Sequence, residues 1–112
     1  MLFGAMIAAD RALDALGDPT RRQVFERLRR GSCSVRHIAQ GMDVTRPAVS
    51  QHLKVLRDAG LVKFRSAGTQ RIYEIDQRGV RAVRRWLDEF WDEALAAFKA
   101  SAERQAAKER RS

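Results

Sequence analysis

The alternation of apolar and polar residues between positions 34 and 62 predicts two short helices joined by a tight turn. The first helix runs from Val35 to about Gln40 and stops at Gly41, since glycine enters left-handed backbone conformations without a steric clash. The second begins after Thr45, a good N-cap residue, and is amphipathic. Such a pair is a helix-turn-helix, whose second helix fits the major groove of DNA. Its apolar face carries Val49, Leu53 and Leu56, and its polar face carries Arg46, Ser50, Gln51, Lys54 and Arg57.

Two further helices precede this pair. Apolar positions at helical spacing predict an amphipathic helix over residues 6–16, ended by Gly17. Asp18 is the expected N-cap of the next helix, which has a proline in its first turn and runs to about Arg30 before Gly31. Most arginines of this second helix are expected to lie in solvent, with one or two of them in reach of phosphate.

Residues 62–65 and 70–75 alternate between apolar and polar side chains, which predicts two strands joined by a turn over residues 66–69. A β-hairpin directly after the second helix occupies the position of a wing, which lies beside that helix along the DNA backbone or in the minor groove. Its inward side chains are Val62, Phe64, Tyr73 and Ile75, and its polar ones include Lys63, Arg65, Gln70 and Arg71.

Asp76 is expected to cap a last, long helix with Gly79 in its first turn. Large apolar residues continue along it at spacings of three and four, and a small domain does not leave so much aromatic surface exposed. We therefore expect this helix and residues 6–16 to form a two-fold dimer that presents two recognition helices. The alternative is that the helix only completes the core of the monomer. The expected interface residues are Met6, Leu13, Trp86, Leu87, Phe90, Trp91, Leu95 and Phe98.

Together these elements predict a mainly α fold with a small β-hairpin: a winged helix-turn-helix of about five helices, homodimeric through its N- and C-terminal helices. Residues 1–105 are expected to form a single DNA-binding and dimerisation domain. The chain is polar and charged from Ser101, where we expect it to fray, and residues 106–112 are expected to be a flexible basic tail.

Composition adds the nature of the partner. The chain has 112 residues, 45% of them hydrophobic, which suffices for one modest core. A formal net charge of +8 favours a polyanion, nucleic acid first and an anionic membrane surface second. The segments 21–43 and 44–75 each carry a net charge of +4, so the charge is concentrated around the helix-turn-helix and the hairpin. A basic surface kept only for solubility is the alternative.

The cellular location is expected to be the cytoplasm, in association with the nucleoid. Cys33 is the only cysteine, so no disulfide forms within the chain, and a reducing compartment fits. No run of residues is long and apolar enough to span a bilayer, and residues 1–9 lack the basic start of a secretory signal. We expect no membrane partner.

Three stretches resemble the ArsR/SmtB-type winged-helix transcriptional regulators: ALGDPTRRQVFERL, VTRPAVSQHLKVLRDAGLV and FRSAGTQRIYEI. The string from Ser50 to Val62 is far more specific than a generic helix-turn-helix pattern. The resemblance implies a homodimer that binds a palindromic operator on double-stranded DNA and represses transcription, often of its own operon. The ending RRWLDEFWDEALAAFK looks like a subgroup without the usual metal-site motifs.

The metal sites that this family implies lack their ligands here. A Cys-x-Cys pair on the first helix of the helix-turn-helix corresponds to Ser34 and Arg36, and the adjacent Cys33 stands alone. Another family site uses Asp, His and Glu on the last helix, but no histidine follows His52. Because thiolate and imidazole ligands come in threes and fours, we expect no metal and no cofactor. The residues identify no small-molecule effector.

Side chains at the start of the recognition helix reach base edges. Arg grips guanine and Gln grips adenine with two hydrogen bonds each, so base contacts are assigned to Arg46, Ser50 and Gln51, with His52 as a fourth candidate. Phosphate contacts, which position the protein and make binding salt-dependent, are assigned to Thr45, Lys54, Arg65 and Arg71. For any single one of these, a solvated surface residue is the alternative.

Other classes of function fit the residues less well. An enzyme would need a nucleophile–base–acid set, a glycine-rich phosphate loop or a metal site, and the sequence offers none of them. A winged-helix module that docks on a protein would carry apolar residues where positions 46–57 are polar and basic. A thiol-responsive regulator that uses Cys33 stays open, although a lone cysteine is more often a small buried apolar residue.

Overall fold

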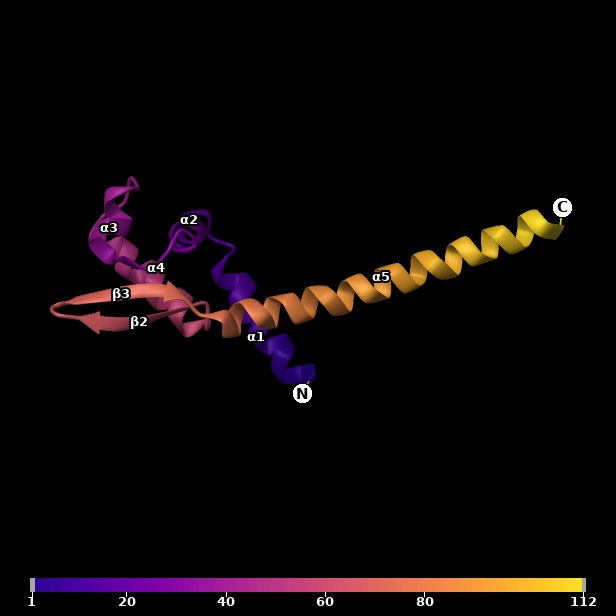
Figure 1. The fold of residues 1–112 in the computed structure, drawn as a ribbon, viewed down its shortest axis with the longest axis horizontal. Coiled ribbons are helices and arrows are strands. Elements are labelled where there is room, and N and C mark those ends of the chain that lie inside the picture. Colours follow the sequence, from indigo (N-terminus) through magenta and orange to yellow (C-terminus); the bar gives the residue numbers. More distant parts are fainter. Residues whose placement is uncertain (1, 112) are drawn as a thin grey trace.

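The computed structural model describes residues 2–111, with side chains from Ile7 onward. Within that range five helices and three strands confirm the predicted winged helix-turn-helix architecture (Figure 1). The elements are α1 Leu2–Ala15, α2 Pro19–Leu28, β1 Cys33–Ser34, α3 Val35–Gln40, α4 Arg46–Asp58, β2 Val62–Ala67, β3 Gln70–Ile75 and α5 Gln77–Arg111.

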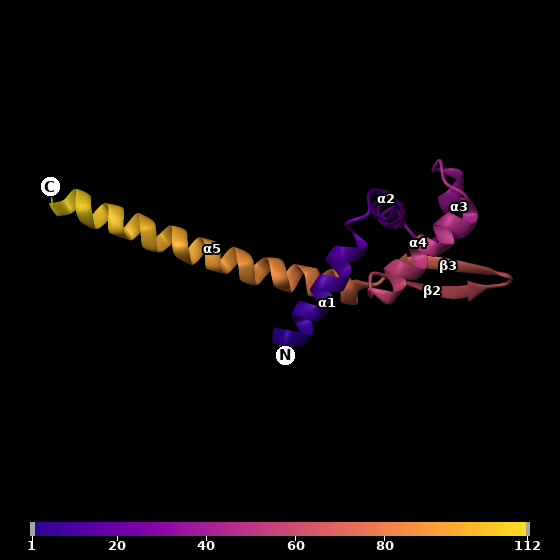
Figure 2. The same ribbon diagram turned by 180° about the vertical axis from the view of Figure 1, so that it is seen from behind.

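The described residues form a head and a long projecting helix. We call α2, α3, α4 and the three strands the head; α5 leaves it at the end opposite the tip of the hairpin (Figures 1 and 2). α1 packs against the first part of α5. The extents of 74 × 31 × 20 Å reflect this projection. No helix in the described range combines the length and apolar character that a bilayer crossing requires.

The helix starts confirm the capping predictions. Asp18 Oδ1 accepts hydrogen bonds from the backbone N–H of Thr20 at 2.9 Å and of Arg21 at 3.1 Å. Thr45 Oγ1 accepts one from the N–H of Ala48 at 3.3 Å. In both helices a proline follows the cap, where its missing N–H removes no intrahelical bond.

Two arginines of α2 have a structural role that the sequence did not reveal. Arg21 Nη1 donates to the carbonyl oxygen of Ala15, and Arg22 Nε donates to that of Leu16, each at 3.1 Å. These carbonyls belong to the end of α1, where backbone acceptors lack intrahelical donors and a positive charge is favourable. Arg21 is half-buried and Arg22 is exposed, most arginines of the helix predicted to about Arg30 do lie in solvent as expected, and these two also tie α1 to α2.

The core of the head is aliphatic and joins α2, α3 and α4 to the sheet. The predicted apolar face of α4 is confirmed, because its three members have no exposed surface. Burial of such side chains stabilises the fold by about 1.5–3 kcal/mol each. The largest fully buried side chains are Val24, Ile38, Val49, Leu53, Leu56, Leu61 and Val62.

The sheet has the strand order β1–β3–β2, and both pairings are antiparallel. In the hairpin the register places Phe64 opposite Tyr73 and Ala67 opposite Gln70. The connection is therefore a two-residue turn, and the predicted four-residue turn was too long. Gly68, with φ +63°, occupies its first central position, as a type II′ turn requires.

Strand β1 was missed from the sequence. It consists of only Cys33 and Ser34, which pair with Tyr73 and Ile72. Two residues are too few for an alternating pattern, and the pairing depends on a partner about forty positions away.

The two glycines that follow α3 and α4 have different backbone conformations. Gly60 follows α4 with φ +75°, a left-handed conformation that suits glycine. Gly41 also ends its helix, but with φ −89° and ψ 2°. The left-handed stop expected at Gly41 is thus wrong, and this position tolerates a side chain without backbone strain.

The end of α5 also corrects the sequence prediction. Instead of fraying at Ser101, the helix continues to Arg111. Residues 102–111 are all alanine, glutamate, glutamine, lysine or arginine, which are among the residues with the highest helix propensities. Helical geometry therefore persists although almost no side chain there is buried.

The start of α5 is fixed by backbone contacts with the segment after α4. The N–H of Asp76 donates to Leu61 and the N–H of Gly79 donates to Gly60, both at 2.9 Å. The buried carboxylate of Asp76 accepts a bond from the N–H of Arg78 at 3.0 Å and pairs with its guanidinium at 2.7 Å. A Cβ at position 79 would collide with the Gly60 carbonyl, which explains a glycine in the first turn of a helix.

We expect Gly79→Ala to lower the free energy of unfolding by about 1–3 kcal/mol, because the added methyl group forces the two backbones apart. Chemical denaturation followed by circular dichroism measures this. Gly41→Ala is the matched control, since a Cβ there comes no closer than 3.9 Å to Ile38 O. Equal stabilities of the two variants would contradict the proposed close approach.

Stability should also depend on pH through Asp76. The hydrogen bond from the Arg78 side chain holds the pKa of Asp76 below its ordinary value, against the opposing effect of burial. A depressed native pKa adds stability that is present above the unfolded value of about 4 and is lost as pH falls through the native value. The difference in unfolding free energy between wild type and Asp76→Asn should shrink below about pH 4. A difference that stays constant with pH would refute the effect.

Candidate nucleic-acid interface

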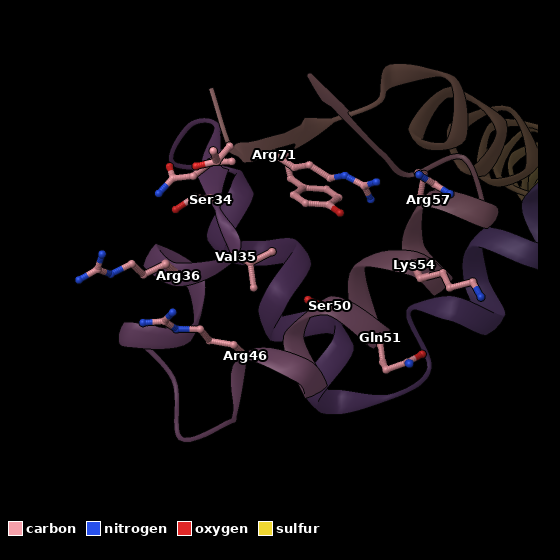
Figure 3. Close-up of a pocket in the computed structure, with 12 residues that line it drawn as sticks. Ser34, Val35, Arg36, Arg46, Ser50, Gln51, Lys54, Arg57 and Arg71 are labelled. Carbon is pink, nitrogen blue, oxygen red and sulfur yellow. The ribbon is translucent and has the colours of Figure 1, made fainter. Parts of the chain in front are cut away.

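A groove of about 620 Å³ runs between α4, the start of α3 and the inner side of the hairpin (Figure 3). Figure 3 labels nine of the side chains that line it, which come from β1, α3, α4 and the hairpin. The lining residues are Ser34, Val35, Arg36, Arg46, Ser50, Gln51, Lys54, Arg57, Thr69, Gln70, Arg71 and Tyr73.

The α4 side of the groove is polar because the opposite side of that helix is buried. Val49, Leu53 and Leu56 are buried on one side of α4. The polar residues, which recur every three or four positions on the other side, therefore face outward. All five polar residues of this face are exposed and line the groove: Arg46, Ser50, Gln51, Lys54 and Arg57. The sequence prediction thus placed the α4 face correctly.

Two other elements complete the groove. Arg71 and Gln70 come from β3, at the end of the hairpin near its turn. Arg36 comes from the first turn of α3, and the sequence prediction did not assign it a binding role. No sequence signal marks Arg36, since its position depends on the angle between α3 and α4. The position of Arg57 could be predicted from the sequence, because it continues the spacing of polar residues along the exposed face of α4.

The groove is strongly cationic. Five of its lining residues carry a positive charge and none is acidic: Arg36, Arg46, Lys54, Arg57 and Arg71. Within residues 2–111, no carboxylate lies within ion-pair distance of any of these five. Guanidinium groups that form no ion pair within the protein are suited to bind phosphate oxygens and the acceptor atoms of guanine.

Three predicted DNA-contacting residues lie outside the groove lining. Thr45 directly precedes the groove residue Arg46, and its hydroxyl caps α4. Arg65 pairs in register with Ile72 and so points to the opposite face of the hairpin from Phe64 and Tyr73. His52 lies on another side of α4, near the start of α2.

The surroundings of Asp18 confirm this position of His52. The N–H of Arg21 is the main cause that lowers the pKa of Asp18, and the charge of His52 contributes to the same direction. His52 is half-buried there, away from the cationic side of α4.

Cys33 lies on the edge strand β1, and His37 lies in the following helix α3. Cys33 is buried on β1 beside Tyr73. His37 Nδ1 lies 2.8 Å from Ser34 Oγ, so His37 is more constrained than a free surface residue. Within the described residues, no group of three His, Cys, Asp or Glu side chains is close enough to hold one metal ion.

A second exposed surface is the apolar face of α5. Phe98 is 73% exposed, Trp91 62% and Phe90 59%. Trp86 and Phe90 stack on each other with ring centroids 6.1 Å apart. The side chain of Met6, another predicted interface residue, lies outside the described residues. The other exposed members of the predicted set are Leu13, Trp86, Leu87 and Leu95.

Comparison with known proteins gives a consistent picture. A family model described as "Bacterial regulatory protein, arsR family" matches residues 18–63. The HTH-type transcriptional regulator Rv2034 of Mycobacterium tuberculosis is 52% identical over 89 residues, which cover 80% of this chain and 83% of that protein. The transcriptional repressor SdpR of Bacillus subtilis is 26% identical over 76 residues, covering 68% and 84%.

Solved structures agree with this. An ArsR-like transcriptional regulator from Rhodococcus sp. RHA1 has a TM-score of 0.73 at 29% identity, covering 86% of this chain and 93% of that one. The winged helix-turn-helix DNA-binding domain of Mb0332 from Mycobacterium bovis, described as homodimeric, has a TM-score of 0.63 at 27% identity, covering 80% and 83%.

Proposed function

We propose, given that this chain belongs to the arsR family of bacterial regulatory proteins, that it is a homodimeric repressor of transcription which binds a palindromic operator. The family membership makes it an HTH-type transcriptional regulator. The single observation that carries the DNA-binding surface is the groove beside α4, with five cations and no carboxylate. A surface that docks on another protein would be depleted of charge at its centre.

Base contacts are assigned to the first turns of α4. The major groove is about 12 Å wide and admits one helix. Insertion of α4 with its polar face inward brings Arg46, Ser50 and Gln51 to base edges, since all three are exposed and share that face. His52 faces α2 instead, so we leave it out of the base-contacting set.

Phosphate contacts are assigned around this helix. Lys54 lies further along α4, and Arg71 lies across the groove on β3. Two phosphate contacts are assigned outside the groove. The hydroxyl of Thr45 lies at the start of α4, and the guanidinium of Arg65 lies on the outer face of the wing. Contacts of this kind carry no sequence information but set the register of the protein on the duplex.

Dimerisation through α5 and α1 follows from the exposed aromatic face. A row of exposed large apolar side chains such as this one marks an interaction surface. The homodimeric state of the Mycobacterium bovis domain supports a second copy of this chain as the partner. A two-fold axis would place two α4 helices one turn of DNA apart, about 34–36 Å, which matches a palindrome. We place the dimer in the cytoplasm, on the chromosome.

The base-contacting role predicts a loss of specificity. Arg46→Ala and Gln51→Ala should each weaken operator binding by about 1–3 kcal/mol while changing affinity for random duplex much less. Operator fragments selected from the organism's own genomic DNA and a scrambled duplex provide the two substrates, with binding measured by fluorescence anisotropy. Lys54→Ala is the contrast, since loss of a phosphate contact lowers both affinities alike. Equal losses on both duplexes for Arg46→Ala and Gln51→Ala would refute base contact.

The dimer interface predicts a change in assembly. Trp91→Ala should weaken self-association by about 2 kcal/mol or more, roughly 30-fold, because large aromatic side chains dominate interface energies. Sedimentation velocity over a concentration series measures this. Glu89→Ala is the control, since the rotation of about 100° per residue places Glu89 on the opposite side of α5. A monomeric wild-type protein at micromolar concentration would end the proposal.

A further inference from the structure

Phe64 lies beneath two guanidinium groups that come from different elements. The Cζ atom of Arg71, on β3, is 4.3 Å from the centre of the Phe64 ring, and that of Arg57, in the last turn of α4, is 5.2 Å from it. The ring itself is held by the buried Tyr73, with the two ring centroids 5.4 Å apart and their planes tilted by 48°. Phe64 is thus half-buried and packed against the core, with the two guanidinium groups over its ring.

The strand register explains why Arg71 reaches this ring. Ser66 is paired with Arg71, and Phe64 is paired with Tyr73, so Arg71 and Phe64 are diagonal neighbours on the same face of the hairpin. This is the face that packs on α4, from which Arg57 comes. Figure 3 shows both arginines extending toward the same end of the groove.

The charges around the ring are not balanced by the protein. Arg57 and Arg71 are exposed, and among residues 2–111 neither has an ion-pair partner. The negative face of an aromatic ring attracts a guanidinium, but two like charges at one ring still repel each other. An anion between them removes that repulsion, and the planar donor fork of arginine matches the oxygens of a phosphate.

We propose that Arg57 and Arg71 together bind one backbone phosphate of the DNA duplex, and that Phe64 is the positioning residue that holds both guanidiniums ready for it. This phosphate site rests on the proposed DNA-binding function and adds two features to it. Arg57 acquires a role, and the wing and recognition helix contact the same phosphate rather than separate ones.

The test measures duplex affinity as a function of salt concentration for wild type and for Phe64→Leu, which keeps an apolar residue but removes the aromatic face. We expect Phe64→Leu to bind about three- to tenfold more weakly and its slope of log K against log salt to become shallower by about 0.9, the value for one phosphate. Phe64→Tyr should restore both quantities. Phe25→Leu, another half-buried aromatic on α2, is the matched control and should change stability but not the slope.

Arginine variants test the site without touching the core. Arg57→Lys and Arg71→Lys keep the charge but lose stacking and the planar fork, so each should weaken binding. Their effects should be less than additive in the double variant, since both act on one phosphate. If wild type binds the operator while Phe64→Leu and both lysine variants keep its affinity and slope, the shared site is refuted. If wild type ignores every duplex at low salt, the proposed function fails instead.

Discussion

The burial of one face of α4 is the constraint on which the rest of this structure depends. Val49, Leu53 and Leu56 have no exposed surface, and their burial sets the rotation of the helix about its own axis. A helix advances by about 100° per residue, so this rotation leaves no choice of which residues face outward. The caps at Thr45 and Gly60 fix its two ends. The chemistry of the binding surface is thus a consequence of core packing.

The second determinant is the junction at which α5 leaves the head. Backbone bonds from Asp76 to Leu61 and from Gly79 to Gly60 hold the first turn of α5 against the end of α4. Beyond its contact with α1 the helix projects away from the head, so Phe90, Trp91 and Phe98 stay more than half exposed within the chain. In the proposed dimer those residues supply the interface, and the stability of the protein becomes dependent on its concentration.

Two groups of positively charged residues in this protein have different roles. Arg21, Arg22 and Arg78 are held by carbonyl or carboxylate oxygens of the chain and serve the fold. The five cations of the groove have no such partners within the described residues. A net charge of +8 does not distinguish such groups, so the clustering of five cations without a carboxylate in the groove is the better guide to where a polyanion binds.

Local pattern was enough to predict the presence of the helices, the caps at Asp18 and Thr45, the wing and the polar face of α4, because helix periodicity and capping involve residues within a few positions of each other. Interactions between distant segments could not be predicted in this way. How the elements pack decides that β1 pairs with β3 and that Gly79 contacts Gly60. It also decides that Arg36 lines the groove, whereas His52 and Arg65 do not. The stacking of Arg57 and Arg71 on Phe64 is of the same kind, since three elements must first come together before one ring can hold two charges.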